Sequence, residues 1–555
     1  MINKRLQELS LLAGGTIIVF GAAVLLVTAL LWAFGIAIST WNLPAGAGLA
    51  VVALALGVNR YVEGSLQKAV VFAGVLAFAA VLLWLSVLLG GSYFDVSYDG
   101  QGYHTDAVIK LHDGWNPFHQ PYTGNVWNDH YAKGSEILAA SLYRVTGVLE
   151  QGKAWNFLLL AASFLLAFAG LLSWDRQVWR ALLAAVVLAW NPVVINQTLT
   201  FYIDGQLGSL LLCLLGLGAL IAVRGDRWIA LVCAMVLVLI LNNKFTGVVY
   251  AVVLCGGLLA LLWAVGKRRV TGGMTAVIAV AFVVGILFVG WNPYLHNTME
   301  KGHPFYPVAG DGKLDIMDRQ VPGNLVGLPA WKKLAWSVFA HSENVLATQK
   351  AVLKTPFSWT EKEIKAFKGP DPRIGGWGPL FGGAALLGIL VVVLSFLLTP
   401  WRQALLASGV LLIVALSVLV NPEAWWARFT PQLWLIPALA AAYGLVVSNS
   451  RTLQALSLAL LVLMGTNSWL TSQEYFVRQG EYTALVEKQL SVLQRVSQKE
   501  PIPVVLGTPA HGRRFAEHGV RFLAVKKLAC DGQTQLQAST TFVCTPPELK
   551  EKKAK

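Results

Sequence analysis

Two aspartates stand close together in the polar segment that follows the third apolar run of the chain. Residues 92–104 read Ser-Tyr-Phe-Asp-Val-Ser-Tyr-Asp-Gly-Gln-Gly-Tyr-His, so Asp95 and Asp99 follow within a few residues of an apolar helix. A carboxylate held near apolar walls can act as a general base when an acceptor hydroxyl reaches it. The alternative is that both aspartates solvate a loop or cap the helix expected from Tyr103.

A second group of polar residues lies farther along the same segment. Residues 128–136 read Asn-Asp-His-Tyr-Ala-Lys-Gly-Ser-Glu, and they lead into an apolar helix. His130 and Lys133 beside a membrane are suited to holding a lipid phosphate. The alternative is interfacial anchoring by Trp127 and Tyr131.

Three charged residues stand out because the short loops around them carry almost no charge. They are Asp204, Lys244 and Arg428. An ionisable group at the end of a membrane span is costly if it is drawn into lipid, so pairing or function is the default interpretation. One acidic and two basic groups suit an anionic donor that is approached by a neutral hydroxyl. Snorkelling explains Lys244 equally well, but it explains Arg428 less comfortably.

A second long polar segment opens with Trp-Asn-Pro-Tyr at 291–294 and continues with Lys-Gly-His-Pro-Phe-Tyr-Pro at 301–307. Proline and aromatic residues make this stretch rigid, which suits a lid over a binding site, with His303 and Tyr306 as its candidate contact residues. A plain loop is the alternative. The chain has no zinc-ligand pattern and no Walker pattern for a nucleotide.

Apolar helices must position all of these residues. The 555 residues are 56% hydrophobic and 13% charged, and the charged share is roughly half that of a soluble domain. The first apolar run lacks a small-residue cleavage site, which indicates a retained span and not a signal peptide. Apolar runs long enough to cross a bilayer predict an all-α polytopic membrane protein with about thirteen spans. We expect the spans near 11–35, 44–60, 69–90, 153–174, 181–197, 207–223, 228–242, 246–266, 272–291, 378–399, 403–420, 431–448 and 452–469.

Lysine and arginine residues occupy alternate loops between the predicted spans. They are Lys4, Arg5, Arg60, Lys68, Arg176, Arg180, Arg224, Arg227, Lys267, Arg268, Arg269, Arg402 and Arg451. Because basic loops stay in the cytoplasm, we expect a cytoplasmic N-terminus and an extracytoplasmic C-terminus. The long segments 91–152 and 291–377 then lie outside. The net charge of +14 is spread over these turns and forms no patch, which argues against nucleic-acid binding.

The chain beyond 470 reads as a separate extracytoplasmic domain. A helix is expected at 473–498, followed by short β-rich runs, so we predict a transmembrane module over 1–470 and a small α/β domain over 471–555. Cys530 and Cys544 could form a disulfide there if the compartment is oxidising.

The first polar segment resembles the first external loop of the GT-C glycosyltransferases, which include the aminoarabinose transferase of lipid A and the protein O-mannosyltransferases. The resemblance rests on an Asp soon after an early span, an aromatic residue four positions later, an amphipathic helix, and the closing Asp-Gly-Trp at 113–115. It implies that Asp99 is the catalytic carboxylate, with Tyr103 and His104 beside it in the substrate site. Many members have an acid directly after that Asp, whereas this chain has Gly100. A second acidic partner would then be Asp95 or Asp106.

Other stretches resemble the family as well. The Lys-Phe-Thr and Arg-Phe settings of Lys244 and Arg428 look like family positions that contact the phosphate of a lipid-linked sugar. The stretch 301–307 is similar to a Gly-Asn-Pro-x-Tyr-Pro motif, with His303 replacing the usual Asn. Some family members use a divalent cation, so Asp95 and Asp99 could bind Mg or Mn.

The resemblance implies transfer of a sugar from a polyprenyl-phosphate donor to a glycan, lipid or protein acceptor. Direct displacement would invert the anomeric centre, because the sequence offers one well-placed carboxylate and no second nucleophile. The site would lie on the outer side of a bacterial cytoplasmic membrane, among membrane lipids. One alternative is an oligosaccharide ligase or polymerase that uses a polyprenyl-diphosphate glycan. Another is a lipid-linked sugar transporter, which the nearly charge-free spans and the lack of internal repeats disfavour.

Overall fold

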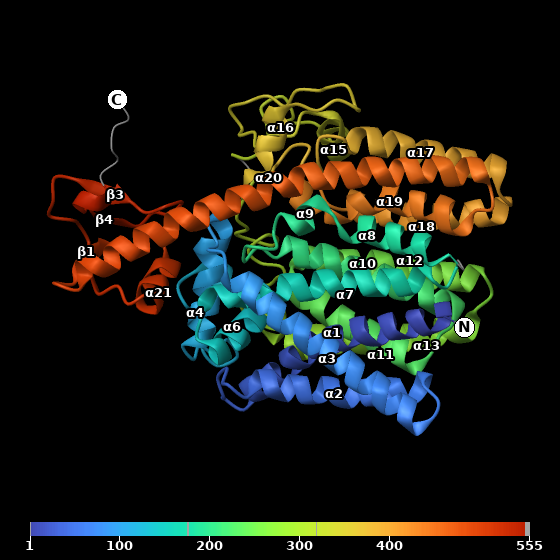
Figure 1. Ribbon diagram of the computed structural model, residues 1–555, viewed down its shortest axis with the longest axis horizontal. Helices are drawn as coiled ribbons and strands as arrows, with labels where there is room; N and C mark the ends of the chain where they lie inside the picture. The colour runs from blue at the N-terminus through green and yellow to red at the C-terminus, as the bar shows by residue number, and fades with distance from the viewer. Residues whose placement is uncertain (1, 175–176, 318, 550–555) are drawn as a thin grey trace.

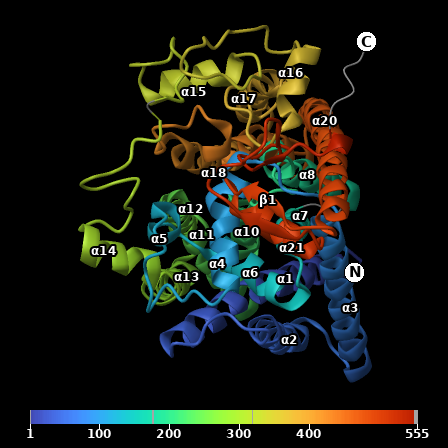
Figure 2. The same ribbon diagram turned by 90° about the vertical axis from the view of Figure 1, so that its left-hand side faces the viewer.

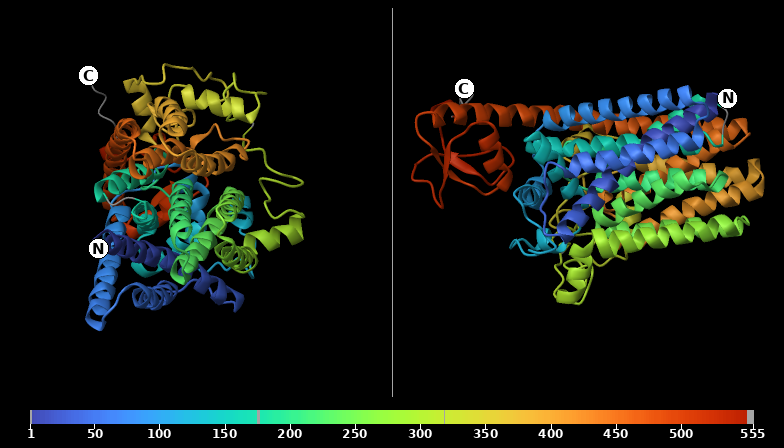
Figure 3. Two further views of the ribbon diagram at one scale, coloured as in Figure 1. Left: turned by 90° about the vertical axis from the view of Figure 1, so that its right-hand side faces the viewer. Right: turned by 90° about the horizontal axis from the view of Figure 1, so that it is seen from below.

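The computed structural model describes residues 2–174, 177–317 and 319–549. Long helices lie side by side in one bundle, and a small α/β domain projects from one end of it (Figure 1). The N-terminus lies at the opposite end of the bundle from this domain (Figure 3). Arg176, one of the basic residues used to orient the chain, lies outside the described residues.

Ten helices of the described chain are long and apolar enough to cross a membrane. They are α1 (Ile2–Ala33), α2 (Asn42–Tyr61), α3 (Ser65–Gly91), η2 with α7 (Leu149–Leu171), α10 (Asp204–Val223), α12 (Phe245–Ala264), α13 with η3 (Arg268–Val289), α17 (Phe381–Leu398), α18 (Trp401–Leu419) and α20 (Arg451–Ser497). Three shorter apolar helices are α8 (Val178–Ala189), α11 (Arg227–Asn243) and the η7–α19–η8 segment (Pro431–Val447). These ten and three helices coincide with the thirteen predicted spans. The chain is therefore an all-α, multi-pass membrane protein with a small α/β domain.

The two long polar segments fold at the end of the bundle that carries the α/β domain (Figure 2). The first contributes η1 (Gly100–His104), α4 (Thr105–His112), α5 (Val126–His130) and α6 (Gly134–Thr146). The second contributes η4 (Trp291–Leu295), α14 (His296–Lys301), α15 (Ala330–Phe339), α16 (Glu361–Lys365) and η5 (Ala366–Lys368). Two short turns, α9 (Pro192–Ile195) and η6 (Ala427–Phe429), join spans.

Helix α20 joins the bundle to the C-terminal domain without a break, because the predicted last span and the helix predicted after it form one continuous helix. The domain adds β1 (Ile502–Val505), α21 (Pro509–Glu517), β2 (Phe522–Ala524), β3 (Gln533–Gln535), β4 (Phe542–Cys544) and η9 (Pro547–Leu549). The sheet order is β2-β1-β4-β3, with β1 parallel to β2 and antiparallel to β4. Apolar side chains from α20, β1, β4 and α21 form the core of this domain.

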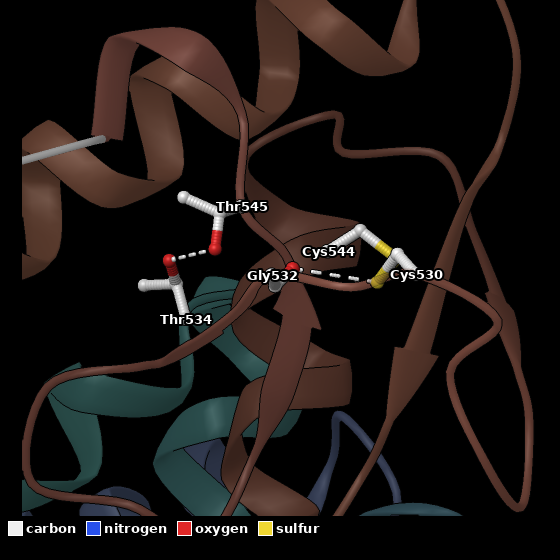
Figure 4. Close-up of a disulfide and its surroundings, with 5 residues drawn as sticks. All are labelled: Cys530, Gly532, Thr534, Cys544 and Thr545. Atoms are coloured by element: carbon white, nitrogen blue, oxygen red, sulfur yellow. Dashed lines mark hydrogen bonds between the residues drawn. A yellow bond between two sulfur atoms is a disulfide. The ribbon is translucent and has the colours of Figure 1, made fainter.

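Cys530 and Cys544 form a disulfide with a Cα–Cα distance of 6.0 Å (Figure 4). The bond ties the segment before β3 to the end of β4. The neighbouring Thr534 hydroxyl donates to the Thr545 hydroxyl at 2.9 Å, across the same pair of strands.

Glycines allow α7 and α10 to approach closely. A Cβ added at Gly216 would lie 2.6 Å from the Leu166 carbonyl oxygen, and one added at Gly170 would lie 2.7 Å from the Gly216 carbonyl oxygen. Small residues at such crossings let helix backbones pack directly, which drives helix association in membranes. This contact lies in the middle of the bundle (Figure 1).

Gly216→Ala is expected to lower the free energy of unfolding by about 1–3 kcal/mol, since the new methyl group forces α7 and α10 apart. Denaturant unfolding in detergent, followed by tryptophan fluorescence, measures the change. Gly256→Ala is the matched control, because a Cβ on that helical glycine meets no atom within 4 Å. Equal stability of the two variants would contradict the close crossing.

Candidate functional site

Asp99 lies between the end of α3 and the π-helical turn η1. Such turns are rare and occur frequently at functional sites. The Asp99 carboxylate accepts a hydrogen bond from Arg428 Nη1 at 2.6 Å. Gly100 is required here, because a Cβ at that position would lie 2.1 Å from Asp95 Oδ2. The space beside the Gly100 Cα atom is thus filled by the Asp95 carboxylate.

Arg428 joins three aspartates that come from distant parts of the chain. Its Nη1 lies 4.0 Å from Asp204 Oδ2, and its Nε lies 3.5 Å from Asp371 Oδ1. Lys244 pairs with Asp204 from the other side. We call Asp99, Asp204, Lys244, Asp371 and Arg428 the charge cluster. The cluster unites four of the residues that the sequence singled out: Asp99, Asp204, Lys244 and Arg428.

Aromatic rings surround the two cations of the charge cluster. The Arg428 guanidinium lies 4.7 Å from the Trp426 ring centroid and 5.2 Å from those of Tyr202 and Phe429. Lys244 Nζ lies 4.6 Å from the Phe429 ring centroid. These faces attract cations and exclude water, so charges in the cluster interact more strongly than they would in solution.

Two carboxylates that share the Arg428 guanidinium have pKa values shifted in opposite directions. Burial alone would raise the pKa of Asp99, but the charge and hydrogen bond of Arg428 hold it below the usual value. Burial dominates at Asp371 and raises its pKa to about 6, against the opposing effect of Arg428. Carboxylates separated in this way are suited to different roles. Asp99 is therefore ionised at neutral pH, whereas the Asp371 carboxyl loses its proton at a pH of about 6.

Asp371 and Arg373 are site residues that the sequence analysis missed. Trp426 Nε1 donates to Asp371 Oδ1 at 2.5 Å, and the Arg373 guanidinium lies 4.8 Å from the Trp426 ring centroid. Arg373 Nε and Nη1 are buried without a hydrogen-bond partner. The signal was an acid and a base in the Pro-Asp-Pro-Arg stretch directly before a span. This signal was hidden because the long loop around Asp371 and Arg373 carries many other charged residues.

His130, Lys133 and Tyr306 meet at a neighbouring position. Lys133 Nζ donates to Asn292 Oδ1 at 2.6 Å and to the Tyr131 carbonyl oxygen at 2.7 Å. Burial lowers the pKa of Lys133 to about 7. The Tyr306 ring centroid lies 4.9 Å from that of His130.

Asn297 connects His130 to the second polar segment. His130 Nδ1 lies 2.8 Å from Asn297 Oδ1, and Asn297 Nδ2 donates to the Tyr306 carbonyl oxygen at 2.8 Å. His303 braces the same turn, because its Nδ1 accepts from the Phe305 amide at 3.1 Å. Of the two predicted lid residues, Tyr306 contacts His130 of the first polar segment. His303 contacts Phe305 of its own segment.

Tyr103 and His104 belong to η1, the turn that directly follows Asp99 of the charge cluster. Their rings lie 4.1 Å apart, and the half-buried Tyr103 also contacts Trp127. His104 is buried, with its Nδ1 2.5 Å from Glu136 Oε1. His104 therefore has a carboxylate partner of its own.

Asp95 is in a different environment from Asp99. Its carboxylate is fully buried and accepts from the backbone amides of Ser97 and Phe201, both at 2.7 Å. Because both donors are backbone amides, the Asp95 carboxylate fixes the backbone around it. Asp106, the other candidate for a second acid, instead accepts from Lys110 at 2.9 Å and Asn128 at 2.6 Å.

The expected pairing of Asp95 and Asp99 around Mg or Mn does not fit this geometry, because each carboxylate faces separate partners. In the part of the chain that the structure describes, no three His, Cys, Asp or Glu side chains form a group that could hold a metal ion.

No protein-family model matches the chain, and no curated protein matches its sequence. Among solved structures, the crystal structure of ArnT from Cupriavidus metallidurans bound to undecaprenyl phosphate is similar to this chain. The identity is 12%, the TM-score is 0.44, and the similarity covers 82% of this chain and 86% of ArnT.

Arg428→Ala is expected to destabilise the protein by about 3–5 kcal/mol at pH 7, because three carboxylates lose their shared cation. The loss should be smaller at pH 5. The pKa of Asp371 is already raised to about 6, and removal of the guanidinium raises it further, so this carboxyl is neutral at pH 5. Unfolding in detergent at both pH values measures the effect. Arg402→Ala, at an exposed arginine, is the control, and a loss independent of pH would contradict the coupling.

Proposed function

We propose that the protein is a GT-C-type membrane glycosyltransferase that moves one sugar from a polyprenyl-phosphate donor to an acceptor hydroxyl. The charge cluster is the observation that carries this proposal. It combines an ionised carboxylate with cations at the end of an apolar bundle, where a lipid-borne phosphate and a water-borne hydroxyl can meet.

Three cations are available for the donor phosphate. Lys244 and Arg428 lie within the charge cluster, and Arg373 lies beside it with buried N–H groups that have no hydrogen-bond partner. A buried donor without a partner is unfavourable, and a phosphate oxygen satisfies it with a strong charge-assisted bond. Arg373 therefore supports an anionic ligand independently of the residues predicted from the sequence.

Asp99 serves as the base. It takes the proton of the acceptor hydroxyl as the acceptor oxygen bonds to the anomeric carbon of the donor sugar. The bond from that carbon to the phosphate oxygen breaks, and its electron pair stays on the polyprenyl phosphate. Lys244 and Arg428 stabilise the negative charge that develops there. Attack opposite the departing phosphate inverts the anomeric centre.

Donor binding would also change the pKa of Asp99. The Arg428 guanidinium holds the pKa of Asp99 low while the two are paired. A phosphate that engages Arg428 competes for this cation, so the pKa of Asp99 rises and the carboxylate becomes a stronger base. Asp371 does not compete for the same atom, because its ion pair with Arg428 is to Nε at 3.5 Å, whereas Asp99 binds Nη1.

We assign the site to the outer side of a bacterial cytoplasmic membrane. The Cys530–Cys544 disulfide lies in the domain at the same end of the bundle as the charge cluster. Disulfides persist in oxidising compartments, which supports an extracytoplasmic location for this end. Glycan, lipid and protein acceptors all carry suitable hydroxyl groups.

The test is to incubate the purified protein with a panel of polyprenyl-phosphate sugars and polyprenyl-diphosphate glycans, and to follow release of the polyprenyl carrier. Consumption of a monophosphate donor with an inverted product, read by NMR, is the expected result. Consumption of diphosphate glycans alone would replace the proposal with an oligosaccharide ligase or polymerase.

Asp99→Asn should fold and insert normally yet lose transfer by about 100-fold or more, since the acceptor proton has no base to receive it. Initial rates with the donor identified above measure the loss. Asp113→Asn, a more exposed acid of the same polar segment, should retain its rate. Full activity of Asp99→Asn would reject Asp99 as the base.

Arg373→Ala should raise the donor KM by about tenfold, because one charge-assisted hydrogen bond to phosphate is lost. The kcat should change little if Arg373 contacts the phosphate before and during transfer alike. Arg319→Ala removes an exposed arginine from the same polar segment and provides the control. An unchanged donor KM in Arg373→Ala would place the phosphate elsewhere.

A further inference from the structure

The C-terminal domain contacts the Asp99 loop through one buried arginine. Arg514 of α21 is 1% exposed, and its Nε and Nη2 donate to Glu150 Oε1 at 2.8 and 2.5 Å. Nη2 also donates to the Asp95 carbonyl oxygen at 2.7 Å, and Nη1 donates to Gln101 Oε1 at 2.9 Å. Asp95 and Gln101 stand on either side of Asp99 in the sequence. The Arg514 guanidinium therefore binds the loop on both sides of the proposed base Asp99.

Glu150 and Lys153 belong to the same network and bind the loop backbone at Asp95 and Tyr93. Glu150 Oε2 accepts from the Asp95 amide at 3.1 Å and from Lys153 Nζ at 2.6 Å, and Lys153 also donates to the Tyr93 carbonyl oxygen. Asp95, Glu150, Lys153 and Arg514 are each at most 2% exposed. Two carboxylates and two cations balance within this network, and satisfied buried networks rigidify the backbone they contact.

Further contacts join the loop to the domain. Gln101 Nε2 donates to the Ala538 carbonyl oxygen at 2.7 Å, and the Leu149 amide donates to Glu517 Oε1 at 3.0 Å. Phe94 packs in the apolar core of the domain, beside Phe515. Helix α21 contacts both α4 and η1, and the domain lies against the first polar segment in Figures 1 and 3. The Asp99 loop is thus built partly into the domain.

We propose that the C-terminal domain acts as a clamp for the catalytic loop, with Arg514 as a positioning residue that sets the place of Asp99. This inference rests on the proposed function, in which Asp99 is the base. The hydrogen bonds of Arg514 go to Glu150, Gln101 and the Asp95 carbonyl oxygen. Loss of Arg514 should affect the proton-transfer step and spare donor binding, because Lys244, Arg373 and Arg428 stand on other segments.

Arginine is needed for its geometry as well as its charge. Its planar fork reaches Glu150, Gln101 and the Asp95 carbonyl group together, whereas a lysine ammonium is a point charge on a flexible stem. Arg514→Lys should therefore keep the pairing with Glu150 and maintain folding, but it should not restore the position of the loop.

The experiment compares Arg514→Ala, Arg514→Lys and Arg513→Ala in the full-length protein in nanodiscs. Arg513 lies on the same helix, is 31% exposed and pairs with Asp113, so it controls for loss of charge. In Arg514→Ala, kcat should fall by about 100-fold with an unchanged donor KM, because small displacements of catalytic groups have effects of this size. Arg514→Lys should recover folding but only part of kcat, and Arg513→Ala should stay within about twofold of wild type.

Hydrogen exchange by mass spectrometry gives a readout that needs no transfer assay. In both Arg514 variants, amides of 93–104 should exchange at least about tenfold faster, while strands β1 and β4 stay protected. Wild-type kcat together with wild-type exchange in Arg514→Ala would overturn the clamp. A parallel rise in donor KM would also overturn it, since Arg514 would then act on donor binding. If wild type consumes no donor, the function fails while the exchange result still decides the clamp.

Discussion

The site depends on one guanidinium placed among three carboxylates at the end of an apolar bundle. Arg428 touches Asp99 and Asp371 and lies near Asp204, with side-chain exposures of 14% or less for Arg428 and Asp204. A charge in such surroundings is tolerated only when paired, and breaking the pair is expensive. The four residues come from four separate loops between spans, so this one cation determines how the loops converge. Lys244 adds a second cation to the cluster by pairing with Asp204.

The membrane explains why the polar residues gather at one end. Spans in lipid cannot carry unpaired polar groups, so ionisable side chains are confined to the ends of helices and to loops. Within that layer, the rings of Tyr131 and Phe245 pack together with centroids 4.6 Å apart. A lipid-borne anion approaching from the bilayer and a polar acceptor approaching from water would meet at such a boundary. Aromatic walls strengthen the interactions of charges there.

Asp95 and Asp99 show how similar residues acquire different roles. Asp95 is fixed by backbone amides and by the network around Arg514, whereas Asp99 projects toward Arg428. Gly100 makes both placements compatible, because any larger residue would collide with the Asp95 carboxylate. The buried acid thus supports the loop that presents the partly exposed acid. The C-terminal domain contributes to the same support, although it begins about 370 residues later in the sequence and forms its own apolar core.

The amino-acid sequence is sufficient to predict the spans, the α/β nature of the tail, and the unusual charges at Asp99, Asp204, Lys244 and Arg428. Span length and hydropathy are local properties, and a single charge in an apolar setting is visible without knowledge of its neighbours. The folded chain is needed to see that these four residues meet, that Asp371 and Arg373 join them, and that Asp95 and Arg514 brace the loop. Those pairings link positions up to 419 residues apart. They depend on burial and direction across the bundle, for which neither periodicity nor spacing provides a signal.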